Sequence, residues 1–533
     1  MTRMFQIKQL RGAALCSALA LAGISIAPGQ AMAEKVLKFV PQTDLKTVDP
    51  FATLSYPVRN FAYLVYDTLF AMDANLEPQP QMVDSWTVSD DRLVWTFKLR
   101  DGLKWHDGAP VTAADCIASL KRWSARDGLA QMMAKVIDKY EAVDDGTFAI
   151  HFSEPFGPVI EALARPSTVP SFMMPERLAM TDPFENNAEA IGSGPFKFLA
   201  DEWNPGSKLV FVKNEDYIPR DEPASFLSGG KVVNFDRVEW VSIPDATTAS
   251  SALAAGEVDW FELPPSDLLP MMAAQDGVEV KNVDPMGSQA VLRMNFTQPP
   301  FDNKAIRQAV LSVINQADYM TAVAGDPDNW LECPSIYPCG TPLSTETGAE
   351  ALMTAPDIEA AKQKIIDAGY AGEKVVIISA SDVPIMQYMA YVTLDLYQKL
   401  GLNVELQATD QGAYFARRNN RGTPEEGGWN TYVSWVNSAD FVNPIGNVML
   451  KATGADGYTG WPDLPNLEAL RSDWLKAATP EDSKAIAADI QTVVYDEVVY
   501  IPLGQFKLPT AYRSELTGVI EAPMMVFWNV DRQ

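Results

Sequence analysis

Histidine is scarce in this chain, and its scarcity excludes most of the usual hydrolytic sites. The 533 residues include two histidines, His106 and His151. A Ser-His-Asp or Cys-His catalyst would need one of them, yet both lie in apolar or turn-rich local sequence, which favours a structural role. The Gly-x4-Gly-Lys-Ser/Thr pattern of a phosphate-binding loop is also missing. We therefore predict no catalytic residue, no metal site and no cofactor, and we expect that the chain is not an enzyme.

Positive charge is also in deficit. The chain carries 42 Lys and Arg residues against 69 Asp and Glu residues, which gives a formal net charge of −27. A nucleic-acid surface needs clustered basic residues that displace phosphate counterions, so this balance argues against a nucleic-acid partner. Acidic pairs such as Asp90-Asp91 and Glu425-Glu426 fall in turn-like segments. We interpret them as solvated loop charges, with the carboxylate pair of an exported hydrolase as a distant alternative.

Long apolar runs are confined to the N-terminus. Three basic residues and no acid lie within residues 1–11, an apolar stretch covers about 12–28, and Ala31-Met32-Ala33 follows. This order is typical of a secretory signal peptide and predicts cleavage after Ala33. Beyond Ala33 no apolar run approaches the roughly 20 residues that a membrane-spanning helix requires. We expect an exported, soluble mature protein.

Cysteine is rare, and its positions fit an oxidising compartment. Cys333 and Cys339 lie in a loop rich in Pro, Gly and Thr, where we predict a local disulfide. Closing this ring of about seven residues would stabilise the fold by roughly 2–2.5 kcal/mol. A metal-binding pair is the alternative, but no histidine lies nearby to complete it. Cys116 falls on an apolar helix stripe and is predicted to be a buried free thiol.

The rest of the chain mixes strands and helices without an internal repeat. Residues 93–100 alternate apolar and polar side chains, as a half-exposed strand does. Thr112 to Asp115 resembles a capping box, Asp302 or Asn303 can cap a second helix, and Thr479-Pro480 starts a third. A single core rarely exceeds about 250–300 residues, so the sequence predicts an α/β protein of two lobes.

Several segments resemble the extracellular solute-binding proteins of peptide- and nickel-type ABC importers, known as family 5. The longest match is residues 90–115, DDRLVWTFKLRDGLKWHDGAPVTAAD. Three further segments follow in the family's order: GSGPFKF at 192–198, AAGEVD at 254–259 and NFTQPPFDNKAIRQA at 295–309. In the family's Lys-x-His-Asp-Gly turn, the residue matching His106 is structural. The resemblance covers essentially the whole mature chain.

The resemblance implies a two-lobed periplasmic binding protein fold (type II, cluster C-like) with solute held between the lobes. Lobe I would cover 34–290 with an extra subdomain at about 66–190, and lobe II 291–503, before residues 504–533 return to lobe I. The chain would cross between the lobes near Val291–Phe296 and again near Pro502–Leu508. Closure about these crossings would trap the solute.

The same resemblance implies a monomeric periplasmic receptor with no chemistry of its own. It would capture an oligopeptide or similar small organic solute and deliver it to an ABC permease with its ATPase subunits. An opine, an oligosaccharide or another cationic or polyhydroxylated solute is the alternative within this role. A nickel chelate is disfavoured, because nickel prefers nitrogen ligands. An exported hydrolase or a chaperone-like protein is a more distant alternative.

Peptide-binding members of the family hold the substrate ammonium with an Asp that follows a Trp at a strand end and precedes a Pro. Here the predicted strand 430–435 ends at Trp435, and the proline is Pro444. Alignment on Trp435 places the Asp position at Ser438, whereas alignment on Pro444 places it at Asp440. We favour Asp440 as the ammonium ligand. Its alternative role is to cap the following turn.

Dipeptide-binding members hold the substrate carboxylate with an Arg in an upstream loop. The matching segment 378–386 has no Arg and contains Asp382 instead. If Asp382 and Asp440 both face the cleft, the solute would be cationic or polyhydroxylated, although longer peptides remain an alternative. Asp382 could equally lie in a solvated turn. An exposed helix is expected to carry the nearby arginines Arg417, Arg418 and Arg421.

Lobe I is expected to contribute the loop after its first strand, with Leu54, Ser55 and Tyr56. Tyr56 would stack on the solute or hydrogen-bond it, with simple packing as the alternative. Trp435 is predicted to form an aromatic wall, whereas Trp429 and Tyr432 are expected in the core or on the surface. The predicted substrate-binding set is Trp435, Asp440, Asn437, Asp382, Ser55 and Tyr56.

Overall fold

The helix starts predicted from capping residues are confirmed in the computed structural model. Helix α2 (Ala113–Arg126) opens with a capping box in which Asp115 N donates to Thr112 Oγ1 and Thr112 N donates to Asp115 Oδ2. Helix α8 (Lys304–Leu311) is capped by Asn303, the second of its two candidates, and α15 (Pro480–Glu497) by Thr479. Strand β6 (Val94–Leu99) forms within the predicted range. These boundaries were readable because capping is local.

The structure describes residues 34–53, 55–167, 169–477 and 479–533. Of these, Lys35–Gln533 form one compact unit. The predicted signal peptide, its cleavage site and Leu54 lie outside the described residues. No helix in the described part of the chain combines the length and the apolarity that crossing a membrane demands.

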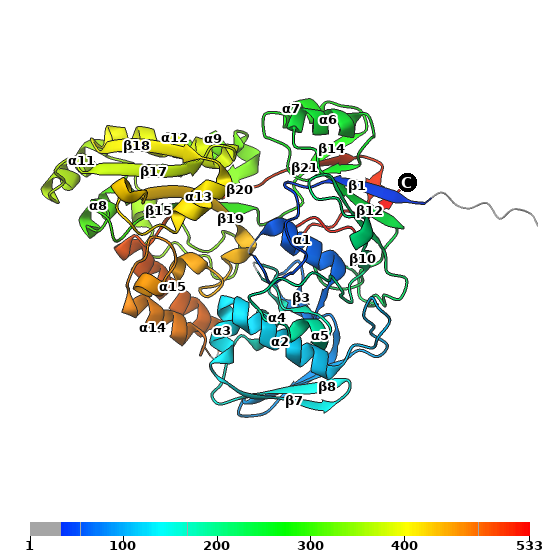
Figure 1. Cartoon of the computed structure of the whole chain (residues 1–533). Coiled ribbons are helices and arrows are strands. Elements are labelled where there is room, and N and C mark those ends of the chain that lie inside the picture. Colours follow the sequence, from blue (N-terminus) through cyan, green and yellow to red (C-terminus); the bar gives the residue numbers. More distant parts are fainter. Residues whose placement is uncertain (1–33, 54, 168, 478) are drawn as a thin grey trace, which may run out of the picture. The chain divides into compact units, whose positions relative to one another are not determined.

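A mixed seven-stranded sheet gathers both ends of the described chain (Figure 1). Its strand order is β10-β11-β12-β1-β13-β21-β14, with β1 parallel to β12 and β13 and the other pairs antiparallel. Helices α6 (Ala246–Ala254) and α7 (Leu269–Ala273) pack beside it. Its strands are β1 (Val36–Val40), β10 (Phe196–Phe198), β11 (Lys208–Lys213), β12 (Arg237–Val241), β13 (Trp260–Phe261), β14 (Val278–Lys281) and β21 (Thr510–Arg513).

A six-stranded sheet takes up the middle of the sequence, in the order β16-β20-β15-β19-β17-β18. Strand β15 pairs antiparallel with both β19 and β20, so segments about two hundred residues apart become neighbours. The chain passes between the two large sheets twice, at 282–287 and at 507–509. The first passage lies before the crossing predicted near Val291–Phe296, where the structure has β15, and the second overlaps the end of the crossing predicted near Pro502–Leu508. The strands are β15 (Ser288–Met294), β16 (Trp330–Leu331), β17 (Lys374–Ala380), β18 (Asn403–Thr409), β19 (Thr431–Asn437) and β20 (Ile501–Phe506).

Strand β17 is buried on both faces, and its alternating side chains enter two different cores. Val375 and Ile377 join the main core, to which helix α12 (Pro384–Lys399) contributes Tyr397. Val376, Ile378 and Ala380 face an aromatic cluster instead. That cluster contains Tyr414, Trp429, Tyr432 and Trp461. Trp429 and Tyr432 are therefore core residues, one of the two expected placements.

The part of the chain between 66 and 190 contains a separate antiparallel sheet, β5-β6-β8-β7, against which α2 packs (Figure 1). On α2, Cys116, Leu120 and Trp123 are buried along one face, and Cys116 is a free thiol. The elements here are β2 (Asp67–Thr68), β3 (Phe70–Met72), β4 (Pro78–Pro80), β5 (Val83–Val88), β7 (Ile137–Asp144), β8 (Thr147–Phe152), β9 (Phe172–Met173), α3 (Gly128–Ala134), α4 (Val159–Ala164) and α5 (Glu176–Ala179).

His106 has the structural role expected of it. Its ring Nε2 lies 3.1 Å from the carbonyl oxygen of Gly194, and burial lowers its pKa to about 4. The ring is therefore neutral near pH 7 and donates to a backbone carbonyl.

The remaining α-helices and strands are α1 (Tyr56–Val65), α9 (Gln316–Ala324), α10 (Glu350–Met353), α11 (Ile358–Asp367), α13 (Gln411–Arg418), α14 (Pro465–Trp474), β22 (Leu516–Thr517) and β23 (Asp531–Arg532).

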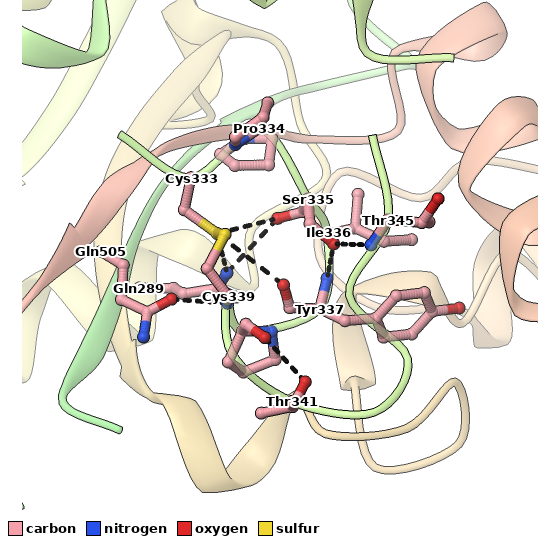
Figure 2. Close-up of a disulfide and its surroundings, with 12 residues drawn as sticks. Gln289, Cys333, Pro334, Ser335, Ile336, Tyr337, Cys339, Thr341, Thr345 and Gln505 are labelled. Carbon is pink, nitrogen blue, oxygen red and sulfur yellow. Dashed lines mark hydrogen bonds between the residues drawn. A yellow bond between two sulfur atoms is a disulfide. The ribbon is translucent and has the colours of Figure 1, made fainter. Parts of the chain in front are cut away.

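The predicted disulfide between Cys333 and Cys339 is present, with Cα atoms 5.8 Å apart (Figure 2). Its loop is hydrogen-bonded to two neighbouring strands. Gln289 of β15 donates through Nε2 to Ser335 O at 3.4 Å, and Cys339 N donates to Gln505 Oε1 of β20 at 2.8 Å. The ring therefore fastens to both strands that run into the passages between the sheets.

Candidate functional site

A cavity of about 520 Å³ lies among residues that are far apart in the sequence. One part of its lining comes from the segment between β1 and α1, including Gln42, Ser55 and Tyr56. The other part comes from the six-stranded sheet and the segments that follow it, including Trp435 and Asp440. This volume is in the range of sites that enclose small organic ligands.

Tyr56, Trp435, Asn437 and Asp440 meet at one corner of this cavity. The Tyr56 hydroxyl donates to Asp440 Oδ2 at 2.9 Å and accepts from Asn437 N at 2.8 Å. The rings of Tyr56 and Trp435 have centroids 6.0 Å apart. Tyr56 is placed by α1, whose N-cap is Ser55 and whose second residue is a proline. Five of the six predicted binding residues thus gather here.

Asp440 is the acidic group of this corner. It is 6% exposed, and its Oδ1 makes no hydrogen bond of good geometry to any described residue. Burial raises the pKa of its carboxyl, a rise that the positive charge of Arg59 and the hydroxyls of Ser167 and Tyr56 oppose. Ser438, the other candidate for the ammonium position, is buried and does not line the cavity.

Asn437 joins segments of the protein to one another. Its Oδ1 accepts from Ala439 N at 3.0 Å and caps the short turn that carries Asp440. Its Nδ2 donates to Asp284 Oδ2 at 2.9 Å and to Pro523 O at 3.3 Å. The side chain thereby fixes the backbone that presents Asp440.

Asp382 does not join the group. It is exposed and is not among the residues that line the cavity, whereas Met386, four residues further on, is. The neighbouring Ser381 donates through Oγ to Thr409 O at 3.0 Å. This arrangement fits the solvated turn that the sequence left open as the alternative.

The expectation of an exposed helix is wrong for Arg418, which lines the cavity. Helix α13 begins after Asp410, and its buried Tyr414 lies one turn before Arg418 on the same face. The guanidinium carbon of Arg418 lies 4.8 Å from the ring centroid of Phe415 and 5.6 Å from that of Tyr458. The i, i+4 spacing of Tyr414 and Arg418 was the signal available in the sequence.

A smaller cavity of about 60 Å³ adjoins the same corner: it shares Gln42, Tyr56 and Trp435 with the larger cavity, and Asn437 lines the smaller one. It is lined by Arg59, Glu262 and Asp284. Burial raises the pKa of Glu262 to about 7 and that of Asp284 to about 6. Neither acid belongs to a recognisable motif, so the sequence did not single them out.

Glu262 and Arg59 are held by neighbours from several segments. Glu262 accepts from Gln42 N at 2.6 Å and from Asn60 Nδ2 at 3.0 Å. Arg59 stacks over the Tyr56 ring at 4.6 Å and donates to Ser167 Oγ at 2.7 Å. Among the described residues, no group of three or more His, Cys, Asp and Glu side chains is arranged to hold a metal ion.

Residues 77–450 match the family described as "Bacterial extracellular solute-binding proteins, family 5 Middle", which is more than half of the chain. The chain belongs to the family 5 bacterial extracellular solute-binding proteins. As a family 5 protein it captures a solute for import, and the predicted family and role are confirmed.

A relative from Sinorhizobium fredii, "Probable peptide ABC transporter periplasmic-binding protein y4tO", is 36% identical over 98% of each chain. Among solved structures, a dipeptide-binding protein from Pseudoalteromonas sp. SM9913 in complex with Met-Leu has a TM-score of 0.78 at 19% identity, covering 94% of this chain and 100% of that one. AgaA of A. tumefaciens R10, in complex with agropinic acid, has a TM-score of 0.77 at 21% identity, covering 93% and 99%. These structures confirm the two-lobed α/β fold.

Proposed function

We propose that this family 5 protein is the periplasmic receptor of an ABC importer for a peptide, or a related small organic solute, that carries a free ammonium group. The observation that carries the proposal is Asp440, a buried carboxylate lining a cavity of about 520 Å³, whose Oδ1 makes no hydrogen bond of good geometry to any described residue. A buried charge needs a partner of opposite sign or hydrogen bonds. A solute ammonium would supply both the opposite charge and the hydrogen bonds.

The surrounding residues fit a peptide-sized solute. Trp435 and Tyr56 offer aromatic surface beside Asp440, and such faces pack against planar peptide groups. The peptide-transport name of the S. fredii relative supports the same solute class. Ser55, which precedes Tyr56 in the sequence, adds a small polar group to the same lining.

The proposal includes the rest of the transport cycle. The chain is exported with cleavage after Ala33, acts as a monomer, carries out no chemistry and delivers its solute to a permease with ATPase subunits. Lobe I covers 34–290 and 504–533, including a subdomain at about 66–190, and lobe II covers 291–503. Motion at the two passages between the sheets closes the lobes on the solute.

The test is a ligand panel measured by thermal shift on mature protein that has been unfolded and refolded to remove any bound solute. The panel contains di- to pentapeptides, their N-acetylated forms, opines, oligosaccharides and nickel salts. A peptide at 100 times its dissociation constant should stabilise the protein by about 2.7 kcal/mol. N-acetylation should abolish that shift, because it removes the ammonium.

Two variants make the assignment specific. Asp440→Asn should lose peptide binding and keep a cooperative unfolding transition, whereas the exposed Asp382→Asn is the matched control and should bind as the parent does. Stabilisation by oligosaccharides alone, or equal binding of free and N-acetylated peptides, would overturn the ammonium assignment.

A further inference from the structure

We infer that Arg418 is a second anchor in the cavity and binds an anionic group of the solute, so that the preferred solute is a zwitterion with a carboxylate as well as an ammonium. The inference rests on the proposed function, because it concerns the same cavity and the same bound solute. It replaces the cationic or polyhydroxylated solute that Asp382 and Asp440 together would have implied.

The surroundings of Arg418 are almost entirely aromatic. Its guanidinium carbon lies 4.8–6.0 Å from four ring centroids, those of Phe415, Tyr432, Tyr458 and Tyr414. These rings attract a cation through their faces, which holds the side chain in place. A ring face offers no acceptor in the plane of the guanidinium, so the rings leave its N–H groups free to bind another partner.

Arg418 has no anionic partner in the part of the chain that the structure describes. It forms no ion pair with a carboxylate of the described residues, and its Nε is shielded from solvent without a hydrogen-bond partner among them. The Tyr414 hydroxyl lies within reach of the guanidinium, and that hydroxyl itself donates to Val433 O at 3.4 Å. Most of the five N–H donors of the guanidinium are therefore unused.

Two other buried arginines in this protein have hydrogen-bond partners or an ion pair within the fold. Arg122 pairs with Asp49 at 2.8 Å and also donates to three carbonyl oxygens. Arg293 donates to the carbonyl oxygens of Thr459, Met449 and Val499. Both are structural cations inside the fold. Arg418 differs because it lines a cavity and lacks such partners, and an arginine fork matches a carboxylate with two parallel hydrogen bonds.

Placing Arg418 and Asp440 in the same cavity lining gives the cavity one group of each charge. A free peptide carries the complementary pair, an ammonium at one end and a carboxylate at the other. A C-terminal amide lacks the second charge and would leave the guanidinium without an anion. The structure therefore assigns discrimination between acid and amide forms to Arg418 and discrimination at the amine to Asp440.

The experiment compares a library of di- to pentapeptides prepared as free acids and as C-terminal amides, with dissociation constants measured by calorimetry on the mature protein. The parent protein should bind free acids about ten- to a hundredfold more tightly than the amides, the range expected of charge-assisted hydrogen bonds. Arg418→Gln should remove this preference by weakening acid binding alone, and it should keep the discrimination against N-acetylated peptides.

Arg417→Gln is the matched control, because Arg417 points elsewhere and donates to Gln407 Oε1 and to the carbonyl oxygens of Gly427 and Gly428. It should keep the acid preference. If Arg418→Gln does not fold, the inference is tested by Arg418→Lys and by the ratio of the parent's dissociation constants for acids and amides. Equal binding of acids and amides by the parent would overturn the inference and leave the proposed function standing. Failure of every peptide to bind would instead overturn the proposed function, and the inference with it.

Discussion

At the scale of single residues, the buried carboxylate of Asp440 is a group for which a proton and a solute ammonium compete. Burial raises its pKa above the value of about 3.9 for a free Asp. A proton and a solute ammonium then compete for the same group over a wider pH range. The ionised carboxylate of Asp440 is most available to the solute at high pH, and protonation removes its charge as pH falls through the raised pKa.

We therefore expect peptide affinity to decrease as pH falls, and the decrease should begin above the pH at which a solvated Asp would protonate. Calorimetric titrations with one peptide at a series of pH values measure the effect. Asp440→Asn should bind weakly at every pH and show a flat profile. A parent profile as flat as that of the variant would contradict the role given to the carboxylate.

The residues that line the two cavities differ in how far the sequence could predict their positions. Tyr56, Trp435 and Asp440 could be placed because each lies beside a strand end or a motif that resembles the family. For Arg418 the i, i+4 spacing indicates a face shared with Tyr414, but the sequence does not show that this face of α13 is the one that packs against the six-stranded sheet. The position of Glu262 could not be predicted either, since the hydrogen bonds that hold its carboxyl come from Gln42 and Asn60, which are distant in sequence.

At the scale of elements, the start of α2 ties three segments together through one side chain. Asp115 accepts from Thr112 N at 2.8 Å and from Trp105 Nε1 at 3.2 Å through Oδ2. Its Oδ1 accepts from Glu176 N at 2.7 Å. The capping box is therefore also the junction between the 90–115 segment and the start of α5.

This junction predicts unequal effects for the two capping residues. Thr112→Ala removes both hydrogen bonds of the Thr112 hydroxyl, the one it accepts from Asp115 N and the one it donates to Asp115 Oδ2, and should lower the free energy of unfolding by about 1 kcal/mol. Asp115→Ala also strands the buried Trp105 Nε1 and the Glu176 N–H, so it should cost about 3 kcal/mol. Urea unfolding measures both, with Thr479→Ala at the exposed start of α15 as a control near 1 kcal/mol. Equal losses for Thr112→Ala and Asp115→Ala would show that the junction adds nothing.

At the scale of the whole molecule, the site exists because segments from opposite ends of the sequence meet. The pairing of β15 with β20, and the approach of Tyr56 to Asp440, are long-range contacts that no local pattern encodes. Chain length and the mixture of strands and helices already indicated two α/β lobes, but the way the segments assemble into them could be expected only through resemblance to a family. Helix starts, the disulfide and the buried thiol followed from local chemistry.

The acid-lined smaller cavity affects the stability of the whole fold. A carboxyl whose pKa is raised on folding, to about 7 for Glu262, binds its proton more tightly in the folded state. Its contribution is therefore present at low pH and is lost as pH rises through about 7. We expect the free energy of unfolding to decline between pH 5 and pH 8, with about 2 kcal/mol of the decline due to Glu262.

Glu262→Gln should flatten this decline, because the amide does not ionise. Urea unfolding at pH 5, 6, 7 and 8 measures it, and the exposed Glu425→Gln is the control that should keep the parent's slope. An unchanged slope in Glu262→Gln would assign the decline to other groups, beginning with Asp284, whose pKa burial raises to about 6.

The disulfide loop has a mechanical consequence. Gln289 and Gln505 connect it to β15 and β20, the two strands that lead into the passages at 282–287 and 507–509. A small covalent ring that holds both strands makes this end of the six-stranded sheet stiff. Compliance is then concentrated in the two short links, where Gly287 adopts a φ of +62°. We therefore expect the lobes to move along one defined path, by bending at these two links. The disulfide loop, which lies outside the solute cavity, limits how far β15 and β20 can follow that motion.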